Sequence, residues 1–256
     1  MPNLPGSSPE KDIEMAKIMF EDSRFGPDYL KVYPAMVIPT TELHKMWERG
    51  EYVSYSDLEL KKVLIAVKKL TPKWCRIDRL VRDISKKWVS SGSLVTNMRQ
   101  LIQEELKKTG VKCKCIRCRE VRSGVYDAEV ELLVDERKSL GGKELFLSFE
   151  SQENLFSMLR LRLPKKGEKT LFEELLGAAI VREVHTYGQV MSLQGSSLKE
   201  ESQHRGLGKR LLVKAEEIAV ERGYKKMAII SAVGTREYYR KLGYDLVGEY
   251  MVKDLA

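Results

Sequence analysis

The sequence is poor in cysteine and histidine and has no long apolar run. It contains 4 cysteines and 3 histidines in 256 residues, too few for the disulfide framework of a small secreted protein. No stretch reaches the roughly 20 apolar residues that a membrane-spanning helix requires. The first ten residues also lack the basic and then apolar pattern of a signal peptide. These absences favour a soluble protein of the reducing cytoplasm.

Three of the four cysteines are concentrated within six residues. Cys113, Cys115 and Cys118 form a C-x-C-x-x-C loop, in which three thiolates can converge on one tetrahedral ion. A soft set of sulfur ligands without a charged catalytic neighbour indicates structural zinc, and the alternative is three free thiols without metal. The fourth ligand stays open, with Cys75 and His44 as candidates.

Acidic residues are scarce in the middle of the chain. Residues 61–122 hold 18 Lys and Arg against 5 Asp and Glu, whereas residues 1–60 hold 6 against 11 and the remainder is neutral. Such a local excess favours a surface that binds nucleic-acid phosphates, and Trp74 and Trp88 are suited to stacking on bases. The alternative is a solvated surface with dispersed charges. The basic residues considered are Arg76, Arg79, Arg82, Lys86, Lys87, Lys107, Lys108, Lys112, Lys114, Arg117, Arg119 and Arg122.

Helix and strand patterns alternate along the chain, which predicts a mixed α/β (α+β) fold. In the first part, helices are predicted over 12–20, 41–49, from Ser56 to about 70 and over 97–108, and strands over 29–38 and 74–84. In the second part, strands are predicted over 125–134, 145–149, 155–163, 178–191, 227–233 and 244–253, and helices over 206–222 and 235–242. The first of these strands are expected to form an antiparallel meander.

A glycine-containing segment precedes the long amphipathic helix of residues 206–222. Its sequence is Gln203-His204-Arg205-Gly206-Leu207-Gly208. A helix N-terminus exposes unpaired amides and a partial positive charge, and glycines let a pyrophosphate approach the backbone. A simple tight turn is the alternative. The segment resembles the Gln/Arg-x-x-Gly-x-Gly/Ala motif of the GCN5-related acetyltransferases (GNAT), which implies that residues 203–208 bind acetyl-CoA.

A second segment, Thr235 to Tyr244, resembles the aromatic-Tyr-x-x-x-Gly-aromatic motif of the same superfamily. The resemblance places the motif tyrosine at Tyr239, as a general acid that protonates the CoA thiolate. Tyr238 fits either cofactor binding or the core. Glu183 and His185 share one face of the preceding strand by period-two alternation and are the candidate general bases. Either of them could equally be structural.

Strings spread from end to end resemble the catalytic subunit of Elongator in its archaeal form. They are Met-Pro-Asn-Leu-Pro-Gly at 1–6 and the strings at 27–34, 79–84, 89–92, 119–121, 182–188 and 250–253. Members of that family join a radical-SAM barrel to an acetyltransferase domain. They install a carboxymethyl-type group at carbon 5 of the tRNA wobble uridine.

The resemblance implies three domains and two kinds of cofactor. Residues 1–90 would be the last βα units of the radical-SAM barrel, 91–122 a basic linker with the zinc loop, and 123–256 the GNAT domain. The family also uses a 4Fe-4S cluster and S-adenosylmethionine, but the cysteines here lack the spacing of the cluster loop. We therefore expect a truncated form that binds acetyl-CoA and cleaves its thioester, but does not complete the radical reaction.

The same resemblance also predicts the partners, and two other functions compete with it. The expected partners are the anticodon region of tRNA and, in a eukaryote only, other Elongator subunits. One rival is a protein lysine acetyltransferase, which would act without RNA. Another is a non-catalytic, zinc-stabilised RNA-binding module, against which the intact glycine segment and Tyr239 argue.

Overall fold

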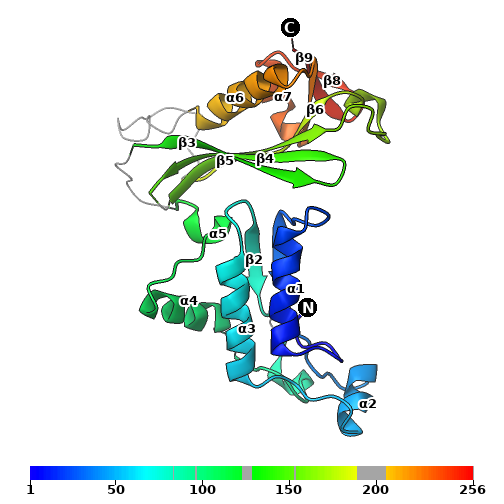
Figure 1. Ribbon diagram of the computed structural model, residues 1–256, viewed down its shortest axis with the longest axis vertical. Coiled ribbons are helices and arrows are strands. Elements are labelled where there is room, and N and C mark those ends of the chain that lie inside the picture. The colour runs from blue at the N-terminus through cyan, green and yellow to red at the C-terminus, as the bar shows by residue number, and fades with distance from the viewer. Residues whose placement is uncertain (83, 96, 123–128, 153, 189–205, 256) are drawn as a thin grey trace. The chain divides into compact units, whose positions relative to one another are not determined.

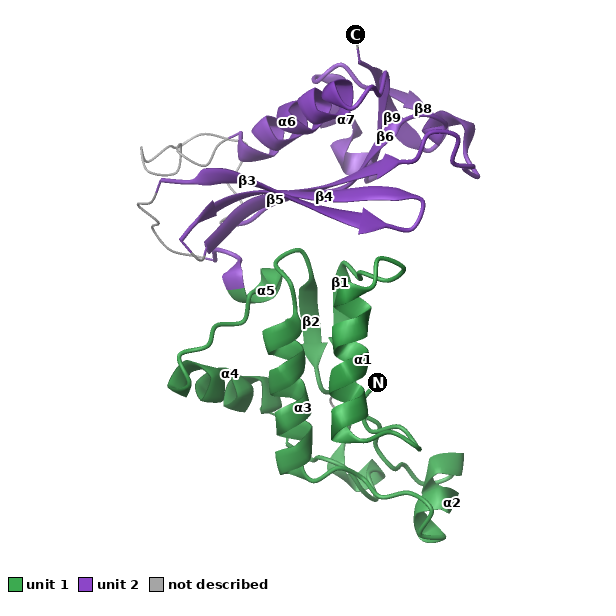
Figure 2. Ribbon diagram, viewed as in Figure 1, with its two compact units in different colours: residues 1–118 green, residues 119–256 purple. Residues whose placement is uncertain are grey.

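The chain divides into two compact units, Met1–Cys118 (unit 1) and Arg119–Ala256 (unit 2), shown in Figure 2. The structure is a computed structural model that describes residues 1–255 except 83, 96, 123–128, 153 and 189–205. Among the described residues, no helix is long and apolar enough to cross a membrane.

Unit 1 is built around a parallel βαβ unit (Figure 1). Strands β1 (Tyr29–Val32) and β2 (Arg76–Leu80) pair in parallel, and α3 (Asp57–Leu70) lies between them in the sequence. α1 (Pro9–Glu21) packs beside α3. The other elements of this part are α2 (Glu42–Glu48), η1 (Lys86–Trp88), α4 (Met98–Lys108) and α5 (Ile116–Arg119), which ends one residue beyond the unit.

α3 begins where the sequence predicts. The Ser56 hydroxyl accepts a hydrogen bond from the Glu59 amide, and the Glu59 carboxylate accepts one from the Ser56 amide. Together these bonds form a capping box. The buried face of α3 carries Leu60, Val63, Leu64, Val67 and also Lys68. Apart from the lysine, this face is the apolar stripe that the sequence indicates.

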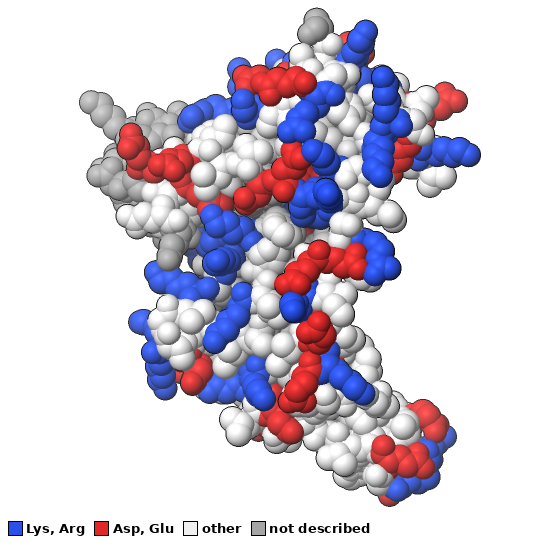
Figure 3. All heavy atoms as spheres, in the orientation of Figure 1, with Lys and Arg blue, Asp and Glu red and all other residues white. Residues whose placement is uncertain are grey.

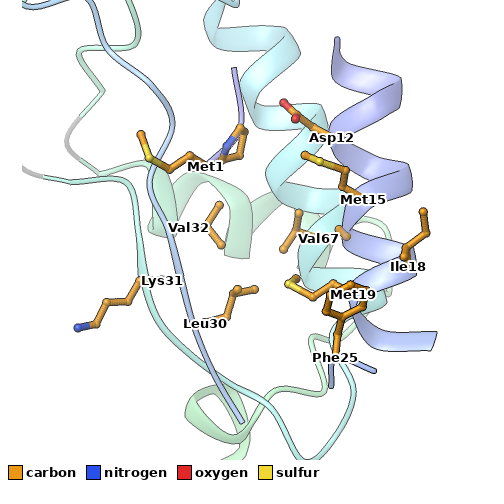
Figure 4. A pocket seen from close by; sticks show the side chains of 12 residues that line it. Met1, Asp12, Met15, Ile18, Met19, Phe25, Leu30, Lys31, Val32 and Val67 are labelled. Atoms are coloured by element: carbon orange, nitrogen blue, oxygen red, sulfur yellow. The ribbon is translucent and has the colours of Figure 1, made fainter. Parts of the chain in front are cut away.

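An apolar cavity of about 410 Å³ lies in unit 1 between α1 and β1. Figure 4 shows Met15, Met19 and Leu30 among the side chains around it. At its rim Met15 is 51% and Phe25 is 55% exposed. Parallel strands normally have both faces covered, so β1 and α1 leave an incompletely covered apolar surface.

Unit 2 contains one seven-stranded sheet with the order β3-β4-β5-β6-β7-β9-β8. The strands β3 to β6 form an antiparallel meander, β7 pairs in parallel with β6, and β9 is antiparallel to both β7 and β8. The strands are β3 (Glu131–Ser139), β4 (Gly142–Ser151), β5 (Asn154–Pro164), β6 (Ala179–Thr186), β7 (Lys226–Ile230), β8 (Asp245–Val247) and β9 (Tyr250–Asp254). The helical elements are η2 (Glu173–Leu175), α6 (Leu207–Glu221), η4 (Val233–Thr235) and α7 (Arg236–Arg240).

The core of unit 2 lies between α6 and one face of the sheet. α6 packs against β4, β5 and β6 (Figure 1). The helical face predicted from the sequence is buried, with Leu211 and Ala215 0% exposed. These side chains meet Leu147, Leu159 and Val181 from the three strands in one apolar cluster.

Several predicted strands are wrong in extent. The strand predicted over 74–84 is limited to β2, and the strand predicted over 125–134 is shifted along the chain to β3. The strand predicted over 29–38 ends at Val32, because Pro34 has no amide to donate, and beyond it only Val37 forms an isolated bridge, to Ser91. The strand predicted over 244–253 is a pair of strands, β8 and β9. Gly248 adopts a left-handed φ of 57° between them, and the chain turns there.

Candidate functional site

Strands β6 and β7 separate after a short stretch of pairing. Ala179, Ile180 and Val181 pair with Met227, Ala228 and Ile229, while β6 continues to Thr186. Beyond Val181, no described strand pairs with β6 on the β7 side. A register shift between Arg160 and Leu161 of β5 leaves Arg182 as an extra residue in β6 at this point, and such bulges re-aim a strand.

The N-terminus of α6 lies against the last residues of β6. A Cβ added to Gly208 would lie 3.3 Å from the Thr186 Oγ1 atom and 3.7 Å from Val184, so the glycine permits this close approach. Gly206 caps the helix with a φ of 84° and no side-chain hydrogen bond, and the first turn holds no acidic residue. Within the described part of the chain, the first amides of α6 are thus not capped by a carboxylate, as an anion-binding helix terminus requires.

The structure describes only part of the segment 203–208 that is predicted to bind acetyl-CoA. Gly206, Leu207 and Gly208 form the start of α6, and Leu207 is buried in the core at 1% exposure. Its side chain therefore anchors the helix, and its contribution to a ligand is limited to its backbone. Gln203, His204 and Arg205 lie outside the described residues.

A small cavity of about 250 Å³ lies between α6, the segment after α7 and β9. It is lined by Lys209, Leu212, Val213, Glu216, Lys241, Leu242 and Lys253. Lys253 is paired with Glu216 at 2.8 Å. Among the described residues, Lys209 and Lys241 form no ion pair, so their charges are available to an anion.

The predicted catalytic tyrosine is largely enclosed. Tyr239 on α7 is 8% exposed, and its ring packs edge to face with that of Tyr238 at 5.2 Å. Burial raises the pKa of Tyr239 above its usual value, as it does the pKa of Tyr238. The phenol of Tyr239 therefore keeps its proton at neutral pH, which a general acid requires. Tyr238 is 43% exposed and lies at the surface.

Glu183 and His185 lie on one face of β6 but in different settings. They pair across the sheet with Arg160 and Met158 of β5, respectively. The Glu183 carboxylate accepts a hydrogen bond of 2.8 Å from Arg160, whose side chain is only 3% exposed. His185 is exposed, and its ring centroid is 4.3 Å from that of Tyr187. The carboxylate is thus engaged by a buried cation, whereas the imidazole faces solvent.

Cys113, Cys115 and Cys118 are brought together in unit 1. Their sulfur atoms all lie within 4.8 Å of one another. The Cys118 amide donates to the Cys115 carbonyl, and the Ile116 amide to that of Cys75, both at 3.0 Å. Hydrogen bonds from the other two thiols, and the charge of Lys68, lower the pKa of Cys118. The arrangement thus favours a thiolate at Cys118.

Neither candidate for the fourth ligand belongs to the cysteine group. The sulfur of Cys75 is not among the ligand atoms that lie together, although its carbonyl contacts the loop. His44 lies on α2, 3.3 Å from Glu48. The structure instead places Lys68 beside the group, with its Nζ atom 3.4 Å from the Cys118 Sγ atom.

Sequence reasoning missed Lys68, but a signal was present. The residue follows Leu60, Val63, Leu64 and Val67 at helical spacing, so a lysine occupies a position of the apolar face. It is 0% exposed. A charged residue at a core position needs a partner, and the cysteine loop supplies one.

The basic residues of the middle segment are largely exposed. Figure 3 shows Lys and Arg side chains gathered over the α4 side of unit 1. Trp88 is 56% exposed, with the Lys87 ammonium 5.4 Å from its ring centroid. Arg119 differs, because it is 6% exposed and pairs with Glu150 at 2.7 Å. Its assignment to a surface for phosphates is therefore wrong.

Comparisons with known proteins match both units. The Radical_SAM C-terminal domain matches residues 27–108, and the Acetyltransferase (GNAT) family matches residues 130–244. The chain is 43% identical to a tRNA uridine(34) acetyltransferase of Dehalococcoides mccartyi over 263 residues, which cover 100% of this chain and 57% of that relative. It is also 43% identical to Elongator complex protein 3 of Homo sapiens, covering 100% and 48%.

A solved structure agrees with these matches. The archaeal Methanocaldococcus infernus Elp3 with an N-terminus deletion has a TM-score of 0.88 and 38% identity, and the match covers 100% of this chain and 62% of that one. The chain thus spans about half the length of the curated relatives it matches.

Proposed function

Because the chain belongs to the family of the tRNA uridine(34) acetyltransferases and Elongator catalytic subunits, we propose that unit 2 binds acetyl-CoA and cleaves its thioester in support of tRNA modification. The observation that carries this proposal is the separation of β6 from β7 next to the uncapped start of α6. A strand edge and a helix N-terminus offer two kinds of backbone donor in one place.

Three parts of the CoA molecule can be assigned to three places in unit 2. The pyrophosphate is proposed to lie on the amides of residues 206–208, and the two amide groups of the pantetheine arm to pair with the open edge of β6. The 3′-phosphate of the adenosine is proposed to lie near Lys209 and Lys241, which line the small cavity beside α6. If Gln203, His204 and Arg205 contribute as the motif predicts, they do so at the pyrophosphate.

The proposed chemical step is hydrolysis or transfer of the acetyl group. A base removes the proton from the attacking water or acceptor hydroxyl. The oxygen of that nucleophile bonds to the thioester carbonyl carbon, and the bond between this carbon and the CoA sulfur breaks. Tyr239 donates its phenolic proton to the leaving sulfur. We favour His185 over Glu183 as the base, because the Glu183 carboxylate is already hydrogen-bonded to Arg160.

We further propose that the cysteine group holds structural zinc. Three sulfurs within 4.8 Å of one another need only a small contraction to reach the roughly 3.8 Å spacing of a tetrahedral site with Zn–S bonds of about 2.3 Å. Zinc would tie together the two ends of the loop of residues 113–118. The C-x-C-x-x-C spacing does not match the cluster loop of the radical-SAM family, so we do not assign these three cysteines to an iron–sulfur cluster.

We propose the anticodon region of tRNA as the partner of unit 1, and the cytoplasm as the location of the reaction. The exposed Lys and Arg side chains and Trp88 support a surface that neutralises phosphates and stacks on a base.

The relatives match equally well in a bacterium and in human, so sequence identity does not favour an archaeal source for the chain.

The test is release of CoA thiol from acetyl-CoA with and without purified tRNA. We expect slow release by the protein alone and faster release with tRNA. A lysine-rich peptide serves as the alternative acceptor, and heat-denatured protein as the blank. Acetylation of the peptide with no response to tRNA would replace this function with that of a protein lysine acetyltransferase. Absence of thiol release in every mixture would refute thioester cleavage by this chain.

A further inference from the structure

Lys68 is a buried cation directed at the cysteine group. It lies in the last turn of α3, and its side chain is 0% exposed. Its Nζ atom donates to the Cys118 sulfur at 3.4 Å. A buried ammonium is strongly unfavourable unless an opposite charge or a hydrogen bond compensates it. The position therefore calls for a negative charge at the cysteine group.

A metal held by this group supplies that charge. Zinc carries two positive charges and three thiolates carry three negative ones, so the bound site has one net negative charge. The fourth position of such a site is filled by no Cys, His, Asp or Glu in the described group. A neutral fourth ligand such as water leaves the negative charge in place, beside an ammonium that offsets it.

We propose that Lys68 is the counter-charge of the zinc site and the hydrogen-bond donor that fixes the Cys118 sulfur. This proposal rests on the zinc site proposed above. Donors to a metal ligand orient it and typically change metal affinity about 10- to 100-fold when removed. Lys68 thus acts through Cys118, as a positioning residue for the metal site.

The neighbouring Arg99 has a different role. Its guanidinium donates to the carbonyl oxygens of Ile77 and Asp78 at 3.0 and 3.2 Å. Burial lowers its pKa, while the cysteines act on it in the opposite direction. Arg99 is therefore hydrogen-bonded to the backbone of β2, whereas the ammonium of Lys68 donates to a sulfur atom.

The test is zinc affinity by competition with a chromophoric chelator, on the full chain. Lys68→Met keeps the length and packing of the side chain but removes its charge, and is expected to weaken zinc binding about 10- to 100-fold. Lys68→Arg keeps the charge and should retain most of the affinity. The matched control is Lys69→Met, which changes the exposed neighbour on the same helix and should bind like the unaltered chain.

Each outcome decides the proposal. Equal affinity of Lys68→Met and the unaltered chain would overturn it, and so would Lys68→Arg binding as weakly as Lys68→Met, because charge would then not be the cause. An unaltered chain that takes up no zinc would remove the zinc site itself, which is a distinguishable failure. Cobalt(II) charge-transfer absorption and circular dichroism of each variant show that three thiolates still bind and that the chain is folded.

Discussion

At the scale of single residues, the candidate catalytic groups of unit 2 are distinguished by their surroundings more than by their type. Tyr238 and Tyr239 are adjacent, yet one is 43% exposed and the other 8%. Glu183 and His185 share a strand face, yet the first is bound to Arg160. Burial therefore distinguishes the phenol of Tyr239 from the surface phenol of Tyr238. The hydrogen bond from Arg160 distinguishes the Glu183 carboxylate from the exposed imidazole of His185.

Tyr239→Phe should lower the rate of CoA thiol release by about 10²-fold or more, because a general acid contributes at least that much. Acetyl-CoA affinity should be unchanged, since the ring remains. Because the pKa of Tyr239 is raised, its acidic form persists below that value and is lost only at still higher pH. The rate should therefore show no loss from this group between about pH 6 and 9. Rates and dissociation constants are measured separately across this range.

Tyr238→Phe is the matched control for this experiment. The exposed phenol lies next to Tyr239 on the same short helix, so its removal tests whether any tyrosine hydroxyl in this segment matters. A rate that falls equally in both variants would contradict the assignment to Tyr239.

Sequence alone identifies the residue types at these sites but not their pairing. The cysteine loop is local in the chain, so its convergence follows from spacing. The pairing of Arg160 with Glu183 depends on strand register, and the burial of Arg119 depends on the contact of the end of α5 with Glu150 of β4. Composition and charge reveal neither. The same holds for Lys68, whose position on an apolar face is visible in the sequence but whose partner is 50 residues away.

At the scale of elements, α6 provides an internal comparison of its two ends. Gly206 precedes the helix with a φ of 84°, and Gly223 follows it with a φ of 81°. A Cβ added to either glycine would meet no atom of the described residues within 4 Å. Substitution at both ends therefore has the same local cost, and only the N-terminal end is proposed to bind a ligand.

Gly206→Ala and Gly223→Ala should each destabilise the chain by about 1–2 kcal/mol, because a left-handed conformation is unfavourable for alanine. Gly206→Ala should in addition weaken acetyl-CoA binding by an order of magnitude or more, because the first amides of α6 shift. Thermal unfolding measures the first effect and isothermal titration the second. Equal acetyl-CoA affinity in the two variants would exclude the α6 N-terminus as the pyrophosphate site.

Elements with local signals were predicted well and those with special backbone geometry were not. The capping box at Ser56 and Glu59, the meander and the amphipathic pattern of α6 are confirmed. The strand at 29–38 was overextended past Pro34, and the turn at Gly248 was missed. A lone glycine in an apolar run has several structural meanings, and only the strand pairing decides among them.

At the scale of the whole molecule, charge is divided between the units. The basic excess predicted over residues 61–122 falls almost entirely in unit 1. Because phosphate contacts release counterions, tRNA affinity should fall steeply with salt. A thioester site in one unit and a phosphate-binding surface in the other would let the two ligands be altered independently.

Arg79→Ala combined with Lys107→Ala should weaken tRNA binding and reduce the slope of log affinity against log salt concentration by about 1.5, as expected for the loss of two phosphate contacts. Acetyl-CoA affinity should not change. The matched control is Lys165→Ala with Lys166→Ala, which removes two exposed lysines from unit 2. Filter binding over a range of salt concentrations gives both slopes. A similar loss in the control would mean that tRNA responds only to net charge.

The short pairing between β6 and β7 also determines when the proposed acetyl-CoA site can form during folding. The meander of β3 to β6 joins strands that are consecutive in the sequence, whereas β7 reaches β6 only after the chain has passed through α6. Contacts between distant segments carry a larger loop-closure cost and form late. Only three residue pairs form at that step. We therefore expect the proposed site to be completed last, after the strands β3 to β6 and the helix α6 have formed.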